Sequence, residues 1–161
     1  MVFLGIDPGI ADTGWGIIDA EGSRLKCLAY GSIKTKAGVP VPERLEIIFK
    51  ELNTLIEQYR PVAAGIEELF FAKNAKTALV VGQARGVALL ALHQQKLPIM
   101  EFKPVQVKQA VTSYGAADKA QVQRMIKMIL CLDKIPKPDD AADALAIAIC
   151  AATSYRFQIR P

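Results

Sequence analysis

A short apolar segment near the amino terminus, residues 3–6, ends in Asp7 and a Pro-Gly turn, and it constrains the fold more than any other feature of the sequence. An apolar run without polar alternation is typical of a strand at the centre of a sheet, with both faces covered. A carboxylate at the end of such a strand is costly unless it is paired or binds a cation. We therefore expect a buried sheet that presents Asp7 at one edge, where other acids converge on it.

The residues after this turn predict two further strands. Residues 15–19 read as the second strand and residues 25–35 as the third, with a turn at residues 21–23 between them. Three consecutive strands joined by short turns form an antiparallel meander. We expect the sheet to begin with this meander.

A helix and a fourth strand follow. Pro42 suits the first turn of the helix, Pro61 ends it, and residues 62–67 predict the strand. Between the two prolines, apolar side chains repeat at helical spacing, at positions 45, 48, 49, 52, 55 and 56. A strand that returns after a helix is expected beside the first strand and parallel to it.

This arrangement places a second acid beside Asp7. The fourth strand ends in Glu67, and Glu68 follows directly. Two parallel neighbours that both end in an acid bring those acids to the same sheet edge. Strand alternation sends Glu67 and Glu68 to opposite faces, and the pattern alone leaves open which of them joins Asp7.

The remaining elements complete one α/β domain over residues 1–161. We expect a long helix at residues 74–95, a short fifth strand at residues 97–102, and shorter helices that begin at Pro104 and Ala117. The predicted fold class is α/β: a five-stranded mixed sheet, with a meander of strands one to three and then parallel strands, flanked by helices.

Three acids open the last predicted helix, directly after Pro138. We assign Asp139 to the N-cap, a position that aspartate favours. Asp140 and Asp143 are three residues apart and share one face of the helix. An N-cap role does not explain Asp143, which lies in the most apolar run of the chain and needs a cation nearby.

Composition limits the class of protein. Of the 161 residues, 52% are hydrophobic and 22% are charged, which is typical of one globular domain, and the net charge of +4 permits a polyanionic partner. One histidine and three cysteines without a C-x-x-C pair argue against zinc and favour free thiols in a reducing compartment. The chain has no basic leader segment, and its most apolar run, residues 141–152, is short and contains an acid, so we expect a cytoplasmic protein without a membrane span.

Aromatic and basic residues cluster between the fourth strand and the long helix. Phe70 precedes Lys73 and Lys76, and an exposed ring beside cationic side chains can stack on bases or wedge between them. We expect Phe71 in the core and Phe70 on nucleic acid.

Three further basic residues have two interpretations each. Arg85 fits a structural ion pair or a phosphate contact equally well. Lys108 and Lys119 lie near predicted helix starts, and Lys119 follows the candidate N-cap Asp118. Each of the two lysines is either solvated or a phosphate ligand.

The expected acids point to metal-assisted hydrolysis of a nucleic-acid backbone. Asp7, Asp140, Asp143 and one of the two glutamates offer only oxygen ligands, which select Mg²⁺, with Mn²⁺ as a substitute. Two ions about 4 Å apart activate the attacking water and stabilise the leaving oxygen of a phosphodiester. This chemistry needs no histidine base, which suits a chain with one histidine.

Several motifs also resemble the RuvC family of bacterial Holliday-junction resolvases, in order and spacing over almost the whole chain. They are GIDPG at 5–9, TGWG at 13–16, IE at 66–67 with Phe70 and AKNA at 72–75, GQARGV at 82–87, QVKQ at 106–109, and DAADALA at 140–146.

The resemblance implies a ribonuclease-H-like fold and a homodimer with two active sites. It implies Mg²⁺-dependent paired nicking of two strands of like polarity at a four-way DNA junction, in recombination and repair, together with the branch-migration proteins RuvA and RuvB. It also implies roles for individual residues. The family's acids fall on Asp7, Glu67, Asp140 and Asp143, its base-stacking aromatic on Phe70, and its active-site lysines on Lys108 and Lys119.

Three other functions compete with this one. Actin-like ATPases and sugar kinases also begin with a strand, an acid and a glycine turn, but they need two lobes, and 161 residues hold one. A related ribonuclease-H-like nuclease could act on RNA or on linear duplexes. A junction-binding scaffold without chemistry is the non-enzymatic alternative, and the presence of all four acids argues against it.

Overall fold

The computed structural model describes residues 1–68 and 75–159, and the side chains of residues 75–77 and 156–159 fall outside that description. Ten elements follow one another in the order β1 (Val2–Asp7), β2 (Asp12–Glu21), β3 (Arg24–Lys34), α1 (Val41–Tyr59), β4 (Ala63–Glu67), α2 (Ala75–Gln94), β5 (Ile99–Phe102), α3 (Pro104–Thr112), α4 (Lys119–Ile129) and α5 (Asp139–Ile159). Within this part of the chain, no helix has the length and apolar character needed to cross a membrane.

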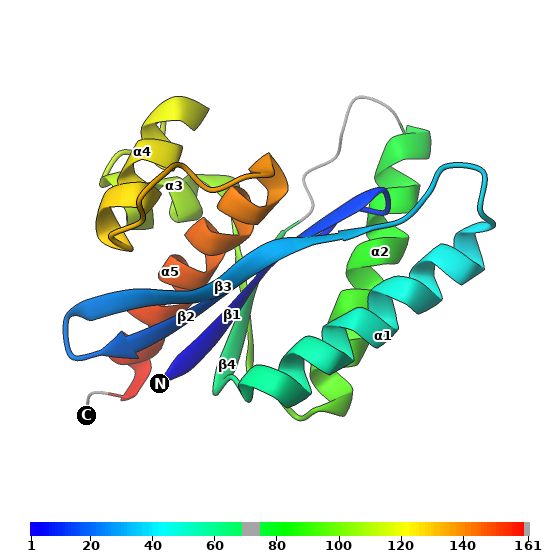
Figure 1. The fold of residues 1–161 in the computed structure, drawn as a ribbon, viewed down its shortest axis with the longest axis horizontal. Coiled ribbons are helices and arrows are strands. Elements are labelled where there is room, and N and C mark those ends of the chain that lie inside the picture. The colour runs from blue at the N-terminus through cyan, green and yellow to red at the C-terminus, as the bar shows by residue number, and fades with distance from the viewer. Residues whose placement is uncertain (69–74, 160–161) are drawn as a thin grey trace.

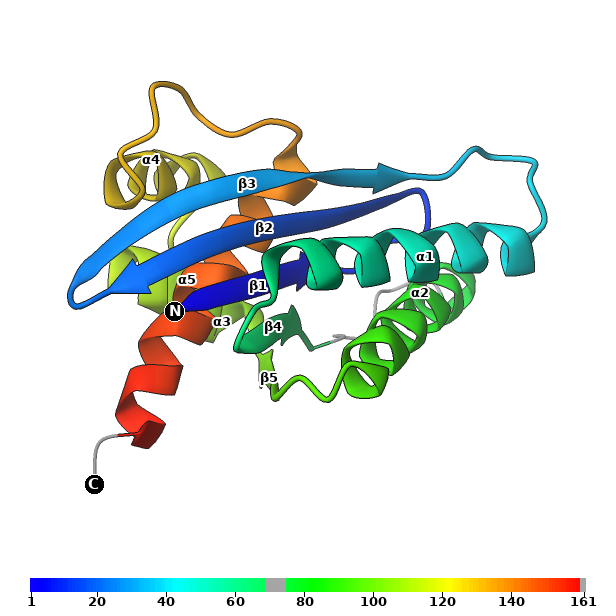
Figure 2. The same cartoon turned by 60° about the horizontal axis from the view of Figure 1, so that its bottom comes forward.

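The sheet has the order β3-β2-β1-β4-β5, with β1 at its centre. β1 pairs antiparallel with β2 and parallel with β4, and β4 pairs parallel with β5. Figure 2 shows these strands side by side, with β1 between β2 and β4. The predicted meander, the mixed sheet and the parallel pairing of the first and fourth strands are confirmed. The second strand is longer than predicted, because it already begins at Asp12.

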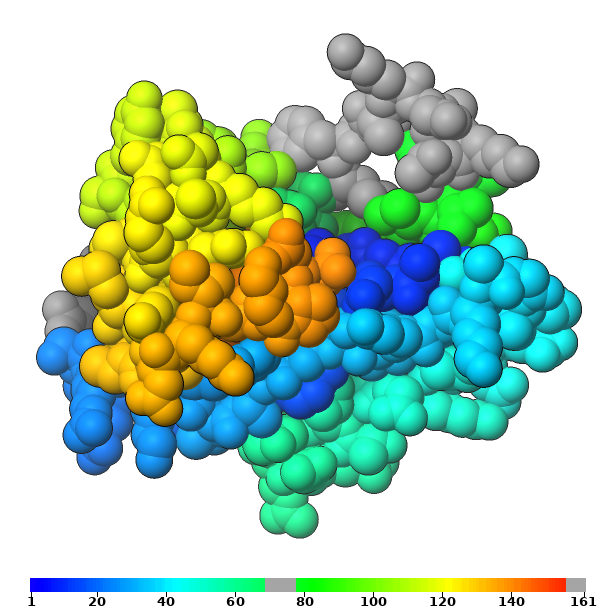
Figure 3. Space-filling model, turned by 45° about the horizontal axis from the view of Figure 1, so that its top comes forward, coloured from blue at the N-terminus to red at the C-terminus, as the bar shows by residue number. Residues whose placement is uncertain are grey.

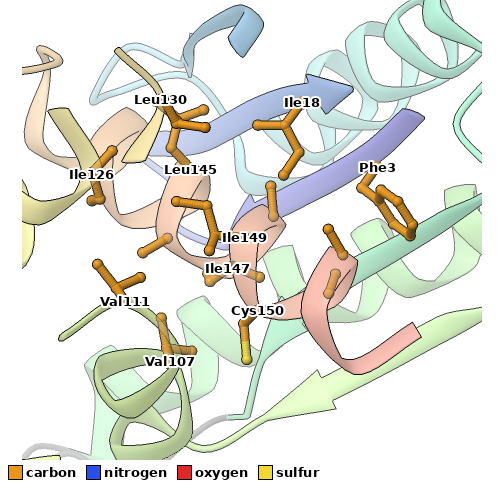
Figure 4. Close-up of a cluster of buried hydrophobic side chains, with 14 of the residues drawn as sticks. Phe3, Ile18, Val107, Val111, Ile126, Leu130, Leu145, Ile147, Ile149 and Cys150 are labelled. Carbon is orange, nitrogen blue, oxygen red and sulfur yellow. The ribbon is translucent and has the colours of Figure 1, made fainter. Parts of the chain in front are cut away.

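Helices cover both faces of the sheet, α1 and α2 on one side and α3, α4 and α5 on the other (Figure 1). Strand alternation divides the core accordingly. Leu4 and Ile6 of β1 pack with the α1 and α2 side, whereas Phe3 packs with the α5 side. Figure 4 shows the cluster on the α5 side, which includes Leu145 and Ile147 of α5 and Ile18 of β2. α5 is therefore a central helix, buried against the strands that carry the N-terminal acid.

Two glycines let α5 lie directly on the sheet. A Cβ atom on Gly5 would overlap the carbonyl oxygen of Ala144, and one on Gly14 would overlap the carbonyl oxygen of Asp140. Gly14 is the register partner of Asp7 across the β1–β2 pair. The first turn of α5 thus packs directly against β2 beside the end of β1, where Asp7 lies. This close contact requires glycine at position 14.

Candidate active site

Asp7 and Glu67 are the last residues of β1 and β4, two parallel neighbours in the sheet. Alternation along β1 puts Asp7 on the same face as Phe3, which packs on the α5 side. Gly65 of β4 faces Ile147 of α5, so Glu67, two residues later, points to that face as well. Glu67, and not Glu68, therefore shares the side of the sheet with Asp7.

α5 supplies the other two acids, Asp140 from its first turn and Asp143 from the start of its second turn. Burial and the nearby carboxylates of Asp143, Glu67 and Asp140 raise the pKa of Asp7 from 3.8 to about 7. Asp7 is therefore close enough to the other three acids to be affected by the charge of each.

The pKa values of two neighbouring carboxylates, Glu67 and Asp143, are also raised. Burial, followed by the charge of Asp143, raises the pKa of Glu67, and the ammonium of Lys108 opposes the shift. Burial also raises the pKa of Asp143, and the nearby Lys119 ammonium opposes it. The cluster carries more negative charge than its two lysines offset, so a divalent cation would stabilise it.

A cavity of about 280 Å³ opens beside these acids. Glu67 and Asp143 line it together with the two lysines predicted from helix starts, Lys108 of α3 and Lys119 of α4. Figure 3 shows the orange beginning of α5 against the yellow α4 segment and next to the blue amino-terminal segment. The rest of the wall is apolar, formed by Pro104, Val107, Val122, Ala146 and Ile147.

The acids do not close tightly around a single point. Among residues 1–68 and 75–159, no three Asp, Glu, His or Cys side chains form a group that could hold a metal ion as they stand. Carboxylates of like charge repel one another, and the Lys119 ammonium lies 3.3 Å from Asp143 Oδ2 instead. The described acids therefore form a loose cluster, and their oxygen donors suit Mg²⁺ chemically.

The assignment of Asp139 to the N-cap is wrong. Asp139 is the first helical residue, and the backbone amides of Ala141 and Ala142 donate to the Pro138 carbonyl. Its carboxylate accepts hydrogen bonds from the Lys137 and Gln123 side chains and pairs with Lys119. These contacts, the one from Lys137 foremost, lower the pKa of Asp139 to about 2. The sequence analysis did not predict that Asp139 pairs with Lys119. The spacing contains a signal for it, since Asp139 and Asp143 are four residues apart and share a helix face.

The neighbouring Asp118 does cap α4, as predicted, and accepts a hydrogen bond from the Gln121 backbone amide.

Arg85 has a structural partner. Its side chain is paired with Glu101 of β5 and donates a hydrogen bond, 3.0 Å long, to the carbonyl oxygen of Glu67. Of the two interpretations left open, we therefore favour the structural ion pair. The Arg85 side chain connects α2 to the end of β4.

Comparison with known proteins identifies the family. The family model described as "Crossover junction endodeoxyribonuclease RuvC" matches residues 3–151. The chain belongs to the RuvC family. The RuvC protein of Natranaerobius thermophilus, also named crossover junction endodeoxyribonuclease, is 52% identical over 160 residues, which are 99% of each chain.

Solved structures agree with this assignment. Thermus thermophilus RuvC in complex with a Holliday junction substrate superposes with a TM-score of 0.93 at 36% identity, over 98% of this chain and 96% of that one. The yeast mitochondrial Holliday junction resolvase Ydc2 has a TM-score of 0.64 at 18% identity, over 97% and 83% of the two chains, which shows a common fold alone. The predicted ribonuclease-H-like fold is confirmed, and RuvC membership excludes the actin-like ATPase alternative.

Part of the expected DNA-binding surface lies outside the described residues. Phe70, Phe71 and Lys73 fall in the segment 69–74, and Lys76 is in α2 with its side chain outside the description. Their roles stay predictions, which rest on the RuvC resemblance for Phe70 and on the local cluster of aromatic and basic residues for the other three.

Proposed function

We propose that this chain resolves four-way (Holliday) DNA junctions as a crossover junction endodeoxyribonuclease, by paired symmetric nicking of two strands of like polarity in recombination and repair. One observation carries the proposal. The carboxylates of Glu67, Asp140 and Asp143 all act electrostatically on Asp7 where β1, β4 and α5 meet, in a chain of the RuvC family. Two of these acids, Glu67 and Asp143, line a cavity together with two lysines, which suits a polyanionic substrate.

The four acids would hold Mg²⁺, with Mn²⁺ as a substitute, and we propose two ions. The donors are all carboxylate oxygens. Burial raises the pKa of Asp7 first, and the three nearby carboxylates raise it further against the opposing charge of Lys119, so a cation would stabilise the ionised cluster. When bound, such ions activate a water molecule and stabilise the leaving oxygen of a phosphodiester.

The chain's basic side chains position the substrate in this proposal. Lys108 and Lys119 border the cavity next to Glu67 and Asp143, so a phosphate that lies there meets two ammonium groups. We propose Phe70 as the residue that stacks on bases, with Lys73 and Lys76 beside it on the DNA backbone.

A homodimer would supply the two sites that paired nicking requires. α2 offers a surface for it. Leu79 and Leu90 are 67% and 49% exposed, and Gly86 between them is exposed, with nothing within 4 Å of the position a Cβ would take. The three residues lie at helical spacing on one face. An exposed stripe of large apolar and small residues favours close packing against a second copy.

Leu90→Glu is therefore expected to convert the dimer to a monomer, because a carboxylate at the centre of an apolar contact loses its hydration. Sedimentation velocity at several concentrations measures the effect. Leu28→Glu on β3, where the leucine is 42% exposed, is the matched control and should stay dimeric. A Leu90→Glu protein that still sediments as a dimer would contradict the use of this helix face.

The family also suggests the cellular setting. We propose that the chain works with the RuvA and RuvB branch-migration proteins in the cytoplasm, where the bacterial chromosome lies. RuvC membership supports both statements.

The decisive experiment compares substrates. Purified protein is incubated with an end-labelled synthetic four-way junction, a linear duplex of the same sequence and an RNA–DNA hybrid, with Mg²⁺ or with EDTA. We expect symmetric nicks in two strands of the junction, dependent on Mg²⁺, and little cutting of the other substrates. Equal cutting of duplex or hybrid would favour the general ribonuclease-H-like nuclease, and junction binding without any cut would favour the scaffold.

A further inference from the structure

Lys119 stands between two acids of α5. Its Nζ atom lies 3.3 Å from Asp139 Oδ2 and 3.3 Å from Asp143 Oδ2. The two aspartates are four residues apart, so their side chains stack on one face, one helical turn from each other. One ammonium group is thus shared evenly between an acid of the proposed active site and an acid outside it.

Two further side chains orient Asp139, the acid outside the proposed active site. Asp139 Oδ1 accepts hydrogen bonds from Lys137 Nζ at 2.7 Å and from Gln123 Nε2 at 3.2 Å, which leaves Oδ2 to Lys119. Gln123 is buried and is one helical turn after Lys119 on α4. The same helix therefore presents Lys119 and orients the carboxylate that receives it.

We propose that Asp139 is a positioning residue that holds Lys119 at the rim of the active site and so leaves the Asp143 carboxylate open to a divalent cation. The inference rests on the proposed function, in which Asp143 is a cation ligand. An ammonium in contact with Asp143 competes with a cation for the same oxygens. With Asp139 as a second partner, Lys119 can release Asp143 and remain paired, and its charge stays where a DNA phosphate would meet it.

The alternative is a purely local role, in which Asp139 only ties the segment before α5 to α4. That role also explains the contacts of Lys137 and Gln123. The two alternatives differ in their dependence on Lys119, because a local tie acts whether or not Lys119 is present.

A double-mutant cycle with Mn²⁺ as the probe separates the alternatives. Binding of Mn²⁺ to the DNA-free protein is measured by electron paramagnetic resonance for the unchanged chain, Asp139→Asn, Lys119→Met and the double variant. Asp139→Asn removes a nearby negative charge, which weakens Mn²⁺ binding whether or not Lys119 is present. The relevant quantity is therefore the difference between its effect with Lys119 and its effect with methionine at position 119. We expect Asp139→Asn to weaken Mn²⁺ binding roughly threefold more when Lys119 is present than when it is methionine.

The control is Lys137→Met, which removes one partner of Asp139 Oδ1 but leaves the Gln123 hydrogen bond and the Lys119 contact. It should not weaken binding, because Gln123 still orients the carboxylate. Thermal unfolding of each variant checks that the fold is intact. Equal effects of Asp139→Asn in both backgrounds would overturn the positioning role and leave the proposed function standing. An unchanged chain that binds no Mn²⁺ would contradict the proposed metal site itself, and this inference with it.

Discussion

Asp7→Asn is expected to bind a four-way DNA junction at least as tightly as the unchanged chain and to nick it roughly 10²–10³-fold more slowly. Asp7 lies where the charges of Asp143, Glu67 and Asp140 meet, so its carboxylate is central to any cation that the cluster holds. Asparagine keeps the size of the side chain but not its charge. Binding persists because lysines supply the phosphate contacts, and the loss of one negative charge reduces repulsion of the DNA.

The measurement is single-turnover nicking of an end-labelled junction in Mg²⁺, with junction affinity measured separately in Ca²⁺ or EDTA. Glu67→Gln and Glu68→Gln form a matched pair in the same assay. The first should behave like Asp7→Asn and the second like the unchanged chain, because Glu67 alone shares the α5 face with Asp7. Nicking at the normal rate by Asp7→Asn would remove Asp7 from the mechanism.

The second large effect is on stability. At pH 8 and without divalent cations, Asp7→Asn is expected to raise the melting temperature of the protein. Folding moves the pKa of Asp7 from 3.8 to about 7, so the folded state binds a proton more readily than the unfolded state between these values. The stability of the unchanged chain therefore falls as pH rises from about 4 to 7. Above pH 7 the ionised carboxylate destabilises the fold by roughly 4 kcal/mol.

Removal of that charge should raise the melting temperature by roughly 8–16 °C at pH 8, and by much less near pH 4. Differential scanning calorimetry from pH 4 to pH 8 in EDTA measures both chains. Added Mg²⁺ should stabilise the unchanged chain and leave Asp7→Asn nearly unaffected, because a ligand that binds the folded state stabilises it. A difference in melting temperature that does not depend on pH would show that Asp7 is not a strained buried carboxylate.

Much of the fold follows from local patterns. The apolar run before Asp7 predicts a central strand, and Pro42 and Pro61 bound the helix that returns the chain to β4. Each of these features depends only on neighbours in the sequence, such as the fixed φ angle of proline or the burial of a continuous apolar strand. For that reason the parallel pairing of β1 and β4, and with it the meeting of Asp7 and Glu67, could be predicted.

Other features depend on contacts between elements distant in sequence. Gln123 on α4 and Asp139 on α5 are hydrogen-bonded in the folded chain, and no periodicity in either helix predicts this. The pairing of Arg85 with Glu101 likewise requires α2 to lie beside β5. Capping by Asp139 was a reasonable prediction from residue type, but the lysines and glutamine around it offered its carboxylate stronger partners than the helix backbone.

Residue order and spacing alone were enough to predict the acids that end two strands and begin the last helix, and the family that the chain resembles. The packing of the elements determines which glutamate faces α5, how far apart the acids lie, and that Lys119 pairs with both Asp139 and Asp143. The physical reason is that residue spacing fixes the direction of a side chain within its own element. The balance of repulsion, burial and ion pairing at a site depends on the distances between elements, and packing sets those distances.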